Sequence, residues 1–392
     1  MSLKAIHVSE VPSLDHFPEN PSLLCSSRKA NNNKFLVVGH RGHGMNMSQS
    51  PDLRFSALKE NSILSFNAAS KLPLDFIEFD VQVTRDGCPV IFHDDFIFSE
   101  EQGVVYEKRV TEVTRDGCPV IFHDDFIFSE EQGVVYEKRV TEVSLSEFMS
   151  YGPQRELEKT GKPLLRKSKE GKILKWTVHG DDSLCTLQEA FEKVVNPNLG
   201  FNIELKLDDN LVYSSDHLSR LLLPILQVVS DFAKDRAIIF SSFHPDAALL
   251  VRKLQTTYPV FFLTNGGTEM YYDARRNSLE EAIKVCLEGG LQGIVSEVKG
   301  VFRNPAAVYK IKESKLSLMT YGKLNNVAEA VYMQHLMGIE GVIVDHVEEI
   351  TEAVSEMMKP SSRDVDDTKP KPNFSERELC FLLKLIPELI QH

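Results

Sequence analysis

The stretch DFIEFDVQVTRDGCPVIFHDD, residues Asp75 to Asp95, governs the interpretation of the whole chain. It opens with a run of β-forming residues and carries two carboxylates, Glu78 and Asp80, two positions apart. Successive side chains of a strand point to opposite faces, so these two point the same way. Two carboxylates on one face are costly to bury unless a cation lies between them, and oxygen ligands suit Mg²⁺ or Ca²⁺. The stretch therefore predicts a strand that holds a divalent metal ion.

A histidine follows this strand on the far side of a predicted turn. Asp86-Gly87 is a tight-turn signal, and the residues from Val90 to Phe92 are again β-formers. A hairpin folding back at the turn would bring His93 near the two carboxylates. The pattern indicates a metal ion with a general acid or base beside it. Taken alone, the carboxylates are also compatible with a solvated strand edge.

Composition narrows the class of protein. The chain has 392 residues, of which 42% are hydrophobic, so it can bury a large core. The net charge of -13 argues against a nucleic-acid partner and against an anionic membrane surface. No apolar run reaches the roughly 18 residues that span a bilayer, so we expect no integral membrane association. The six cysteines show no paired spacing and are predicted to be free thiols in a reducing compartment.

The chain contains an identical tandem repeat. Residues Val83 to Glu112 recur without change as Val113 to Glu142. A single perfect copy indicates a recent duplication or a sequence-assembly error, because structural repeats drift and need several copies. The first copy is continuous with the carboxylates, so its hairpin closes at lower entropic cost, and His93 is a better candidate than His123. We expect the second copy to be an inserted loop, with strand exchange between the copies as the alternative.

Strands and helices alternate through most of the chain. The predicted strands cover residues 34–39, 76–81, 201–205, 237–240, 260–263, 293–296, 316–320 and 342–344. Eight parallel strands alternating with helices predict a (β/α)8 TIM barrel, with a doubly wound open sheet as the alternative. The hairpin after the second strand is expected to be an antiparallel excursion. Residues 153–182, rich in Lys and Gly, are expected to form a further excursion or lid.

The barrel is predicted to occupy residues 34–358, with different segments on either side. Residues 1–33 are either a flexible tail or a transit peptide, although their acidic residues are unusual for a transit peptide. Residues 359–374 are rich in Pro, Ser and Asp and are expected to be a linker. Residues 375–392 form an amphipathic pattern opened by a capping box, which predicts a C-terminal helix. Docking of this helix on the barrel is expected, and a partner-binding surface is the alternative.

Reactive side chains of such barrels lie at the carboxyl ends of the strands. The polar residues at those ends are His40, Arg41, Glu78, Asp80, Glu204, Lys206, Ser241, Tyr321 and Asp345. Three carboxylates could hold Mg²⁺ or Ca²⁺, while a guanidinium and an ammonium suit a phosphate. His40 and His93 could then lie on opposite sides of the phosphorus, one accepting and one donating a proton. Taken alone, each of these residues has a simpler explanation. His40 could be a turn histidine, and Glu204 and Lys206 could form an ion pair at a strand end.

Several longer motifs carry a family resemblance. GHRG, ENSILSFNAA, FIEFDVQVTRDGCPVIFHD and FNIELK occur in this order, followed by FSSFHPDAA and GVIVDHV. Together they resemble the glycerophosphodiester phosphodiesterase family over about Lys34 to Val347, and the whole chain looks like a plant member of the plastid type. The resemblance implies a barrel of the phospholipase C-like phosphodiesterase type and a transit peptide. It also implies a chloroplast location, with the cytoplasm as the alternative.

The activity implied by this resemblance is hydrolysis of small-molecule glycerophosphodiesters to sn-glycerol 3-phosphate and an alcohol. The substrates would be of the glycerophosphocholine, glycerophosphoethanolamine and glycerophosphoglycerol class, as in glycerophospholipid breakdown and phosphate recycling. The implied route forms a cyclic phosphate through the neighbouring glycerol hydroxyl, and water then opens the ring. The implied cofactor is Mg²⁺, with Ca²⁺ as the alternative.

The resemblance also assigns a role to individual residues. The implied metal ligands are Glu78, Asp80 and Glu204. The implied catalytic acid–base pair is His40 and His93. The implied substrate-binding residues are Arg41, Glu60, Lys206 and Tyr321, of which Tyr321 stands where the family often has a tryptophan.

Two other functions compete with this one. The repeated segment could obstruct the pocket and leave a phosphate-ligand-binding barrel without catalysis. A barrel enzyme that uses its metal ion to stabilise an enolate would need a base beside a carbon acid. The two histidines around a phosphate-suited Arg41 favour the phosphodiesterase.

Overall fold

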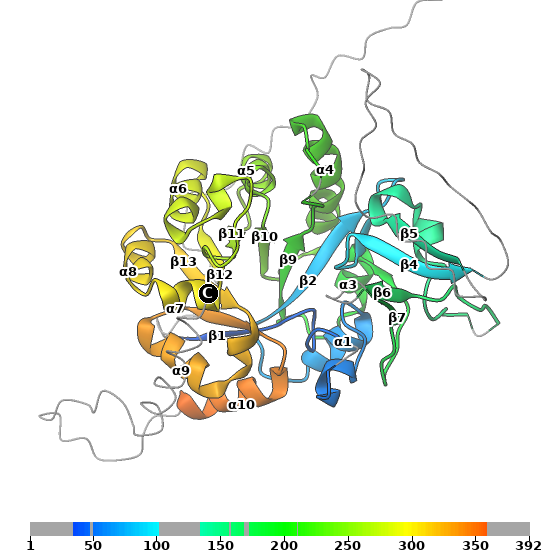
Figure 1. Ribbon diagram of the computed structural model, residues 1–392, viewed down its shortest axis with the longest axis horizontal. Coiled ribbons are helices and arrows are strands. Elements are labelled where there is room, and N and C mark those ends of the chain that lie inside the picture. Colours follow the sequence, from blue (N-terminus) through cyan, green and yellow to red (C-terminus); the bar gives the residue numbers. More distant parts are fainter. Residues whose placement is uncertain are drawn as a thin grey trace, which may run out of the picture. The chain divides into compact units, whose positions relative to one another are not determined.

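A closed barrel of eight parallel strands forms the centre of the molecule (Figure 1). The computed structural model describes residues 34–47, 50–101, 134–156, 158–167, 172–209 and 211–358. The barrel strands are β1 (Leu36–Gly39), β2 (Phe76–Val83), β9 (Gly200–Leu205), β10 (Ile238–Ser242), β11 (Val260–Thr264), β12 (Gly293–Glu297), β13 (Ser317–Tyr321) and β14 (Gly341–Val344). Because β1 pairs in parallel with both β14 and β2, the ring closes. The predicted (β/α)8 barrel is confirmed, and the open doubly wound sheet is wrong.

Helices follow the strands and cover the outside of the barrel (Figure 1). They are α1 (Ile63–Ala69), α3 (Leu187–Lys193), α4 (Ser215–Phe232), α5 (Pro245–Leu254), α6 (Leu279–Gly289), α7 (Val298–Arg303), α8 (Ala306–Glu313), α9 (Ala328–Met337) and α10 (Val347–Met357). Short 3-10 helices are η1 (Leu53–Ser56), η3 (Ala274–Arg276) and η4 (Lys323–Asn326). Thr186 and Glu189 form the capping box that the sequence predicts at the start of α3. Among the described helices, none combines the length and the apolar character that a bilayer crossing requires.

Alternation along β2 explains how its carboxylates reach the barrel interior. Ile77 and Phe79 belong to the large core between the strands and the helices. Phe76 instead belongs to the smaller core inside the barrel. Side chains two positions apart share a face, so Glu78 and Asp80 lie on the same inward face as Phe76, farther along the strand. The inward face of β2 is therefore apolar at Phe76 and carries the two carboxylates nearer the carboxyl end of the strand.

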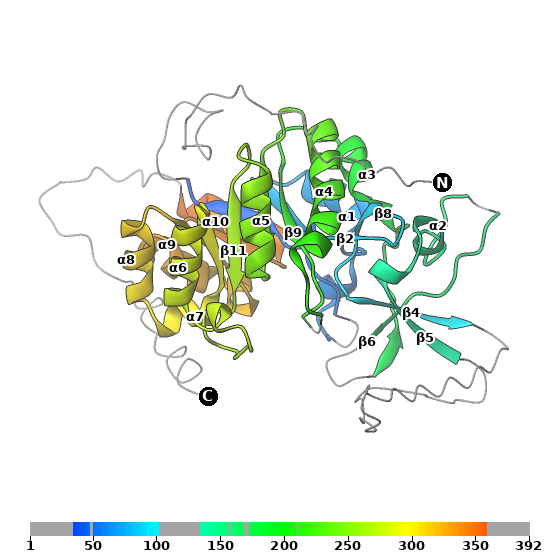
Figure 2. The same ribbon diagram turned by 90° about the horizontal axis from the view of Figure 1, so that it is seen from above.

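Beyond β2 the chain leaves the barrel and builds a second sheet beside it (Figure 2). The short strand β3 (Pro89–Ile91) pairs antiparallel with β2, and β8 (Cys185–Thr186) pairs with β3. The second sheet contains β4 (Phe96–Glu101), β5 (Val134–Arg139), β6 (Leu165–Lys167) and β7 (Ile173–Lys175). It is accompanied by η2 (Val140–Glu142) and α2 (Leu145–Phe148). A separate apolar cluster that includes Phe92, Phe148 and Trp176 gives this part its own core.

The repeat contributes strands from both of its copies. β4 lies in the first copy and β5 lies in the second, and the two pair antiparallel from Phe96 opposite Arg139 to Glu101 opposite Val134. The expectation that the whole second copy is a loop is therefore wrong for residues 134–142, which form β5 and η2. The copies exchange strands, which was the alternative. Residues 113–133 lie outside the described residues.

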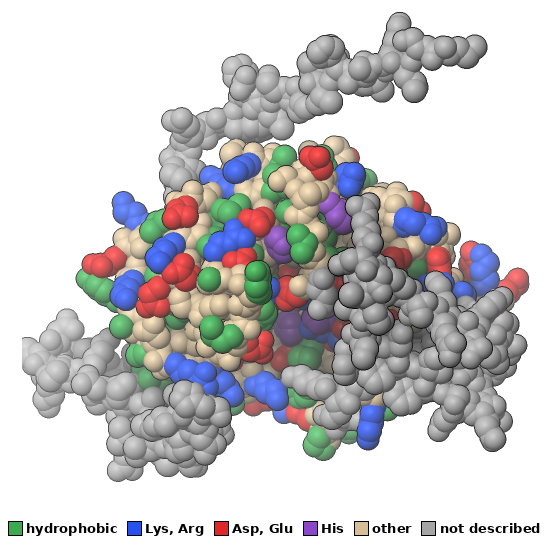
Figure 3. Space-filling view, turned by 45° about the horizontal axis from the view of Figure 1, so that its top comes forward, with side chains coloured by type: hydrophobic (Ala, Val, Ile, Leu, Met, Phe, Trp, Pro, Cys, Tyr) green, Lys and Arg blue, Asp and Glu red, His purple; other side chains and the backbone are tan. Residues whose placement is uncertain are grey.

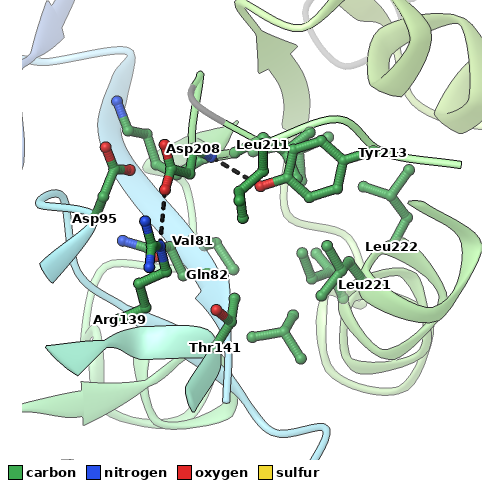
Figure 4. Close-up of a pocket in the computed structure, with 15 residues that line it drawn as sticks. Val81, Gln82, Asp95, Arg139, Thr141, Asp208, Leu211, Tyr213, Leu221 and Leu222 are labelled. Carbon is green, nitrogen blue, oxygen red and sulfur yellow. Dashed lines mark hydrogen bonds and ion pairs between the residues drawn. The ribbon is translucent and has the colours of Figure 1, made fainter. Parts of the chain in front are cut away.

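Arg139, from the second copy, ties the small sheet to the barrel (Figure 4). Its Nε donates to Asp208 Oδ2 at 2.9 Å, and its guanidinium lies 4.5 Å from the ring centre of Phe96. The backbone nitrogen of Asp208 in turn donates to the hydroxyl of Tyr213 at 3.0 Å. The pocket at this junction measures about 20 Å³, which has room for about one water molecule. This small cavity between the second sheet and the barrel is too small for a substrate.

The segments predicted on either side of the barrel lie outside the described residues. These are the tail at 1–33, the linker at 359–374 and the C-terminal helix at 375–392. They stay predictions.

Candidate active site

The carboxyl ends of the barrel strands surround one cleft of about 320 Å³, a size typical of small-molecule sites. Figure 3 views this face, where histidine and acidic side chains gather in a hollow. The predicted site residues that line the cleft are His40, Arg41, Glu78, His93, Glu204, Lys206 and Tyr321. The structure therefore brings most of the predicted site residues to one place.

Three carboxylates converge between β2 and β9. The two strands pair in parallel, with Asp80 opposite Glu204. One oxygen from each of Glu78, Asp80 and Glu204 can be chosen so that all three lie within 4.8 Å of one another. Mg²⁺ and Ca²⁺ bind oxygens at about 2.0–2.6 Å, so three oxygens at this spacing fit a single ion. The predicted convergence of these three residues is present.

The electrostatics of this cluster favour a bound cation. Burial, together with repulsion by Asp80, raises the pKa of Glu78 well above its usual range. Burial likewise raises the pKa of Glu204, although Lys206 opposes the shift. Oε1 of Glu78 is buried and has no hydrogen-bond partner among the described residues. A divalent ion would relieve the repulsion between the carboxylates and could bind Oε1 of Glu78. The residues present therefore fit a metal ion.

His40 follows β1 and is held by the carboxylate of Asp345, which directly follows the neighbouring strand β14. Its Nδ1 lies 2.7 Å from Oδ1 of Asp345, and its Nε2 lies 3.9 Å from Oε2 of Glu78. Asn326 donates to Oδ2 of Asp345 at 2.9 Å, which fixes the carboxylate. Burial acts to lower the pKa of His40, but Asp345 outweighs it and raises the pKa to about 9. The ring therefore points Nε2 toward Glu78 while Asp345 holds the other nitrogen.

Arg41 adopts a strained backbone to reach several carboxylates at once. Its φ of 49° lies in the left-handed region, which side chains other than glycine rarely adopt. Its backbone nitrogen donates to Glu78 Oε2 at 2.9 Å, and its Nη1 donates to Glu60 Oε1 at 2.7 Å. Its Nε lies 3.6 Å from Asp80 Oδ2. The guanidinium is thereby held beside Glu60 and Asp80, and Arg41 lines the cleft.

Glu60 stands behind Arg41, away from the reacting groups. Its side chain is 1% exposed, and Arg166 approaches its Oε1 at 3.0 Å in addition to Arg41. Burial opposes ionisation, but Arg166 and Arg41 lower the pKa of Glu60 to about 2. Its Oε2 accepts from the backbone nitrogen of Asn46, so both carboxylate oxygens are occupied by groups of the chain itself.

His93 is supported from the second sheet. Its Nδ1 lies 2.7 Å from Oδ1 of Asp94, and Arg166 on β6 binds both Asp94 oxygens at 3.1 Å. The guanidinium of Arg166 lies 4.5 Å from the ring centre of Trp176. Burial, with the positive charges of Arg41 and Lys206, lowers the pKa of His93 well below its usual value. A chain of contacts from the small sheet thus orients this histidine.

The remaining predicted residues lie on other parts of the cleft wall. Lys206 Nζ pairs with Glu204 Oε1 at 3.1 Å. Tyr321 lies on the opposite wall, where its hydroxyl donates to Asn265 and its ring meets Phe243 edge-on at 5.8 Å. Ser241 donates to Asn202 at 3.0 Å, and both line the cleft.

The sequence placed Asp345 at the end of a predicted strand but gave it no role, and it did not assign Asp94, Arg166, Trp176 or Asn202 to the site. Asp94 carried a usable signal, because it directly follows His93. Asn202 carried a weaker signal, since it lies two positions before Glu204 and so shares its face. Arg166 and Trp176 lie in the predicted excursion, where no periodic pattern indicates which side chain turns inward.

The match to a protein-family model identifies the family of this chain. The model of the glycerophosphoryl diester phosphodiesterase family matches residues 40–112 and 110–349. The chain belongs to this family. The first match ends at the last residue of the first repeat copy, Glu112, so the break between the matches falls where the chain repeats itself. All nine predicted site residues of this family member lie within the matched ranges.

Relatives of this family member align over its whole length. A chloroplastic glycerophosphodiester phosphodiesterase of Arabidopsis thaliana, GDPD1, is 84% identical over 392 residues and covers 100% of both chains. A second Arabidopsis glycerophosphodiester phosphodiesterase, GDPD2, is 59% identical over 405 residues and also covers 100% of both. The solved structure of an Oleispira antarctica phosphodiesterase, in complex with the product sn-glycerol-3-phosphate, is 18% identical. Its TM-score is 0.51, and the match covers 82% of this chain and 96% of that chain. This match shows a likeness of fold.

Proposed function

We propose that this protein hydrolyses glycerophosphodiesters to sn-glycerol 3-phosphate and an alcohol. The observation that carries the proposal is the convergence of Glu78, Asp80 and Glu204 in a cleft that His40 and His93 also line. Membership of the family and the names of the Arabidopsis relatives support the same activity.

The three carboxylates are proposed to hold one divalent ion, Mg²⁺ by preference. Their oxygens, their burial and the unpartnered Oε1 of Glu78 suit a hard cation. When bound, such an ion would polarise a phosphoryl oxygen and offset the charge of the phosphate. Arg41 and Lys206 line the same cleft and would hold the phosphate oxygens, with Glu60 fixing the orientation of Arg41. Tyr321, on the other wall, would pack against the glycerol.

His40 and His93 are proposed to move the two protons of the reaction. In the first step the neighbouring glycerol hydroxyl oxygen forms a bond to phosphorus, and the bond between phosphorus and the oxygen of the leaving alcohol breaks. In the second step the oxygen of a water molecule forms a bond to phosphorus, and the bond made in the first step breaks, which gives sn-glycerol 3-phosphate. The pKa of His93 is lowered and that of His40 is raised to about 9, so near neutral pH His93 is free to accept a proton and His40 holds one. In the first step His93 would take the proton of the attacking hydroxyl, and His40 would give a proton to the departing alcohol. In the second step His40 would take a proton from water and His93 would return one to the glycerol hydroxyl, which restores both histidines.

The assay that tests this function uses the purified full-length protein and a panel of glycerophosphodiesters. We expect release of sn-glycerol 3-phosphate that stops on addition of EDTA and returns with Mg²⁺. The variant Glu204→Gln should be inactive, while Glu192→Gln, an exposed carboxylate on α3, should behave as the wild type. Turnover that survives complete chelation would refute the metal role, and no turnover on any diester would refute the activity.

The protein is proposed to act in the plastid. Its Arabidopsis relative at 84% identity is described as chloroplastic, and residues 1–33 are the proposed transit peptide. Fusion of residues 1–33 to a fluorescent protein should direct the fusion into plastids, whereas a fusion beginning at residue 34 should stay outside. Uniform cytoplasmic signal from the first fusion would contradict the proposal.

A further inference from the structure

The cleft has a second wall that the proposed reaction does not use. The groups of the proposed reaction lie on β2 and β9 and shortly after β1, β3 and β9, whereas this wall rises from the ends of β10 and β11 and from η3. Its side chains are Phe243, Asn265, Tyr271 and Arg276, with Asp209 at the rim, and we call them the outer wall. Because one cleft joins both walls, a diester held by its phosphate extends toward the outer wall.

Arg276 organises the outer wall. Its side chain is buried, and its guanidinium lies 3.8 Å from the ring centre of Tyr271 and 6.0 Å from that of Phe243. Nη1 and Nη2 bind the two oxygens of Asp209 at 2.7 and 3.1 Å, in a two-pronged pair. Thr264, at the end of β11, donates to the backbone oxygen of Arg276 at 3.2 Å and fixes the loop. A cation of this chain therefore occupies the aromatic face and neutralises the carboxylate.

The rest of the outer wall is rich in hydrogen-bonding groups. Asn265 donates to Glu269 at 2.9 Å, and the hydroxyl of Tyr271 donates to the same carboxylate at 2.8 Å. Asn265 also accepts from the hydroxyl of Tyr321, which links the outer wall to the proposed glycerol contact. Such a surface offers several donors and acceptors, and Arg276 covers one face of its Tyr271 ring.

The position of Asp209 indicates which part of a substrate reaches this wall. Its side chain is 50% exposed, so the pair with Arg276 stands where the cleft opens to solvent. Every glycerophosphodiester shares the glycerol and the phosphate, while the second alcohol differs in size and charge. An alcohol that extends toward this part of the rim would meet the pair of Arg276 and Asp209.

Quaternary ammonium groups are recognised by aromatic faces and by carboxylates. On this wall Arg276 already covers Tyr271 and already pairs with Asp209, so an ammonium would meet a like charge. An uncharged alcohol with several hydroxyl groups would instead find amide, phenol and guanidinium donors and a carboxylate acceptor. The electrostatics of the wall therefore favour a neutral polyol.

We infer that Arg276 makes the protein selective for glycerophosphodiesters whose second alcohol is an uncharged polyol, such as glycerol or inositol, over those that carry an ammonium group. This inference rests on the proposed phosphodiesterase activity. Arg276 acts here as a specificity residue in the outer wall.

The test compares kcat/KM for glycerophosphoglycerol, glycerophosphoinositol and glycerophosphocholine in the wild type and in variants. The wild type should favour the two polyol substrates. Arg276→Gln uncovers Tyr271 and frees Asp209, so the ratio of choline to glycerol substrate should rise on the order of tenfold. Asp209→Asn leaves Arg276 without its counter-charge, so the same ratio should fall, by about threefold.

A matched control comes from the preceding residue. Arg275 lies on the same 3-10 helix but pairs with Asp246 and Asp273, and it does not line the cleft. Arg275→Gln should leave the substrate ratio unchanged. Melting curves identify any variant that fails to fold, and the exposed Asp209→Asn keeps the test available if Arg276→Gln is unstable.

Each outcome bears on a distinct claim. Opposite shifts of the ratio in the Arg276 and Asp209 variants support the inference. Turnover with a preference for glycerophosphocholine in the wild type, or a ratio that neither variant moves, overturns it while leaving the phosphodiesterase intact. Absence of turnover on all three substrates overturns the proposed function and this inference with it.

Discussion

Glu101 and Val134 face each other as the last pair of the β4–β5 ladder, although residues 102–133 separate them along the chain. Val134 is the second-copy equivalent of Val104. Removal of Val113–Glu142 would bring Val104 to the position of Val134, with two residues left to make the turn. Every described residue of the second copy would be replaced by an identical one from the first copy.

Deletion of Val113–Glu142 should therefore preserve activity and raise stability. Shortening the connection from 32 residues to two is worth about 2 kcal/mol in loop-closure entropy, at about 0.6 kcal/mol per halving. Chemical denaturation measures the stability, and the glycerophosphodiester assay measures the activity. If activity appears only after the deletion, the protein with its repeat intact is a binding barrel that has lost catalysis.

His93→Ala should lower kcat by about 10²–10⁴-fold, the usual contribution of a general acid or base. The reason is that His93, from the first copy, lines the cleft together with Arg41 and Lys206. His123→Ala is the matched control in the second copy and should retain activity. The reverse pattern would mean that the second copy supplies the catalytic histidine.

Binding of Mg²⁺ should strengthen as the pH rises. Burial and mutual repulsion raise the pKa values of Glu78 and Glu204, so these carboxylates hold protons at low pH and must release them to bind the ion. Affinity measured by calorimetry should therefore increase between about pH 6 and about pH 8. Affinity that is independent of pH across this range would argue against both carboxylates as ligands.

Asp345→Asn should shift the alkaline limit of activity. Asp345 raises the pKa of His40 to about 9, so a His40 that donates a proton stays active below that pH and fails above it. Without the carboxylate, the pKa of His40 should fall toward the ordinary value of about 6.5, and the upper limb of the pH–rate profile should move to lower pH. An unmoved upper limb, with kcat merely reduced, would indicate that Asp345 only holds the loop.

Arg166→Lys should lower kcat by about tenfold with little change in KM, because a lysine cannot bind both oxygens of Asp94 at once. Without this two-pronged pair, Asp94 would be held less firmly and would orient His93 less well. Lys175→Ala, an exposed residue on β7 of the same sheet, is the control and should have no effect. Equal effects of the two changes would show that the small sheet matters for folding and that Arg166 has no special role.

The sequence by itself determined the eight barrel strands and the residues at their ends. Each strand is buried on both faces and therefore reads as an apolar run, and alternation along β2 fixes Glu78 and Asp80 to one face. The repeat is visible in the sequence, but its outcome is not. Two identical segments offer the same side chains, so local pattern cannot determine that β4 from one copy pairs with β5 from the other.

Only the tertiary structure decided which charged groups support the histidines. His40 and Asp345 are 305 positions apart and meet because closure of the barrel places β1 beside β14. Arg166 reaches Asp94 because the small sheet packs against the barrel, an arrangement set by its own apolar core. Local periodicity reports which face of an element is buried, whereas contacts between distant elements depend on how those faces pack together.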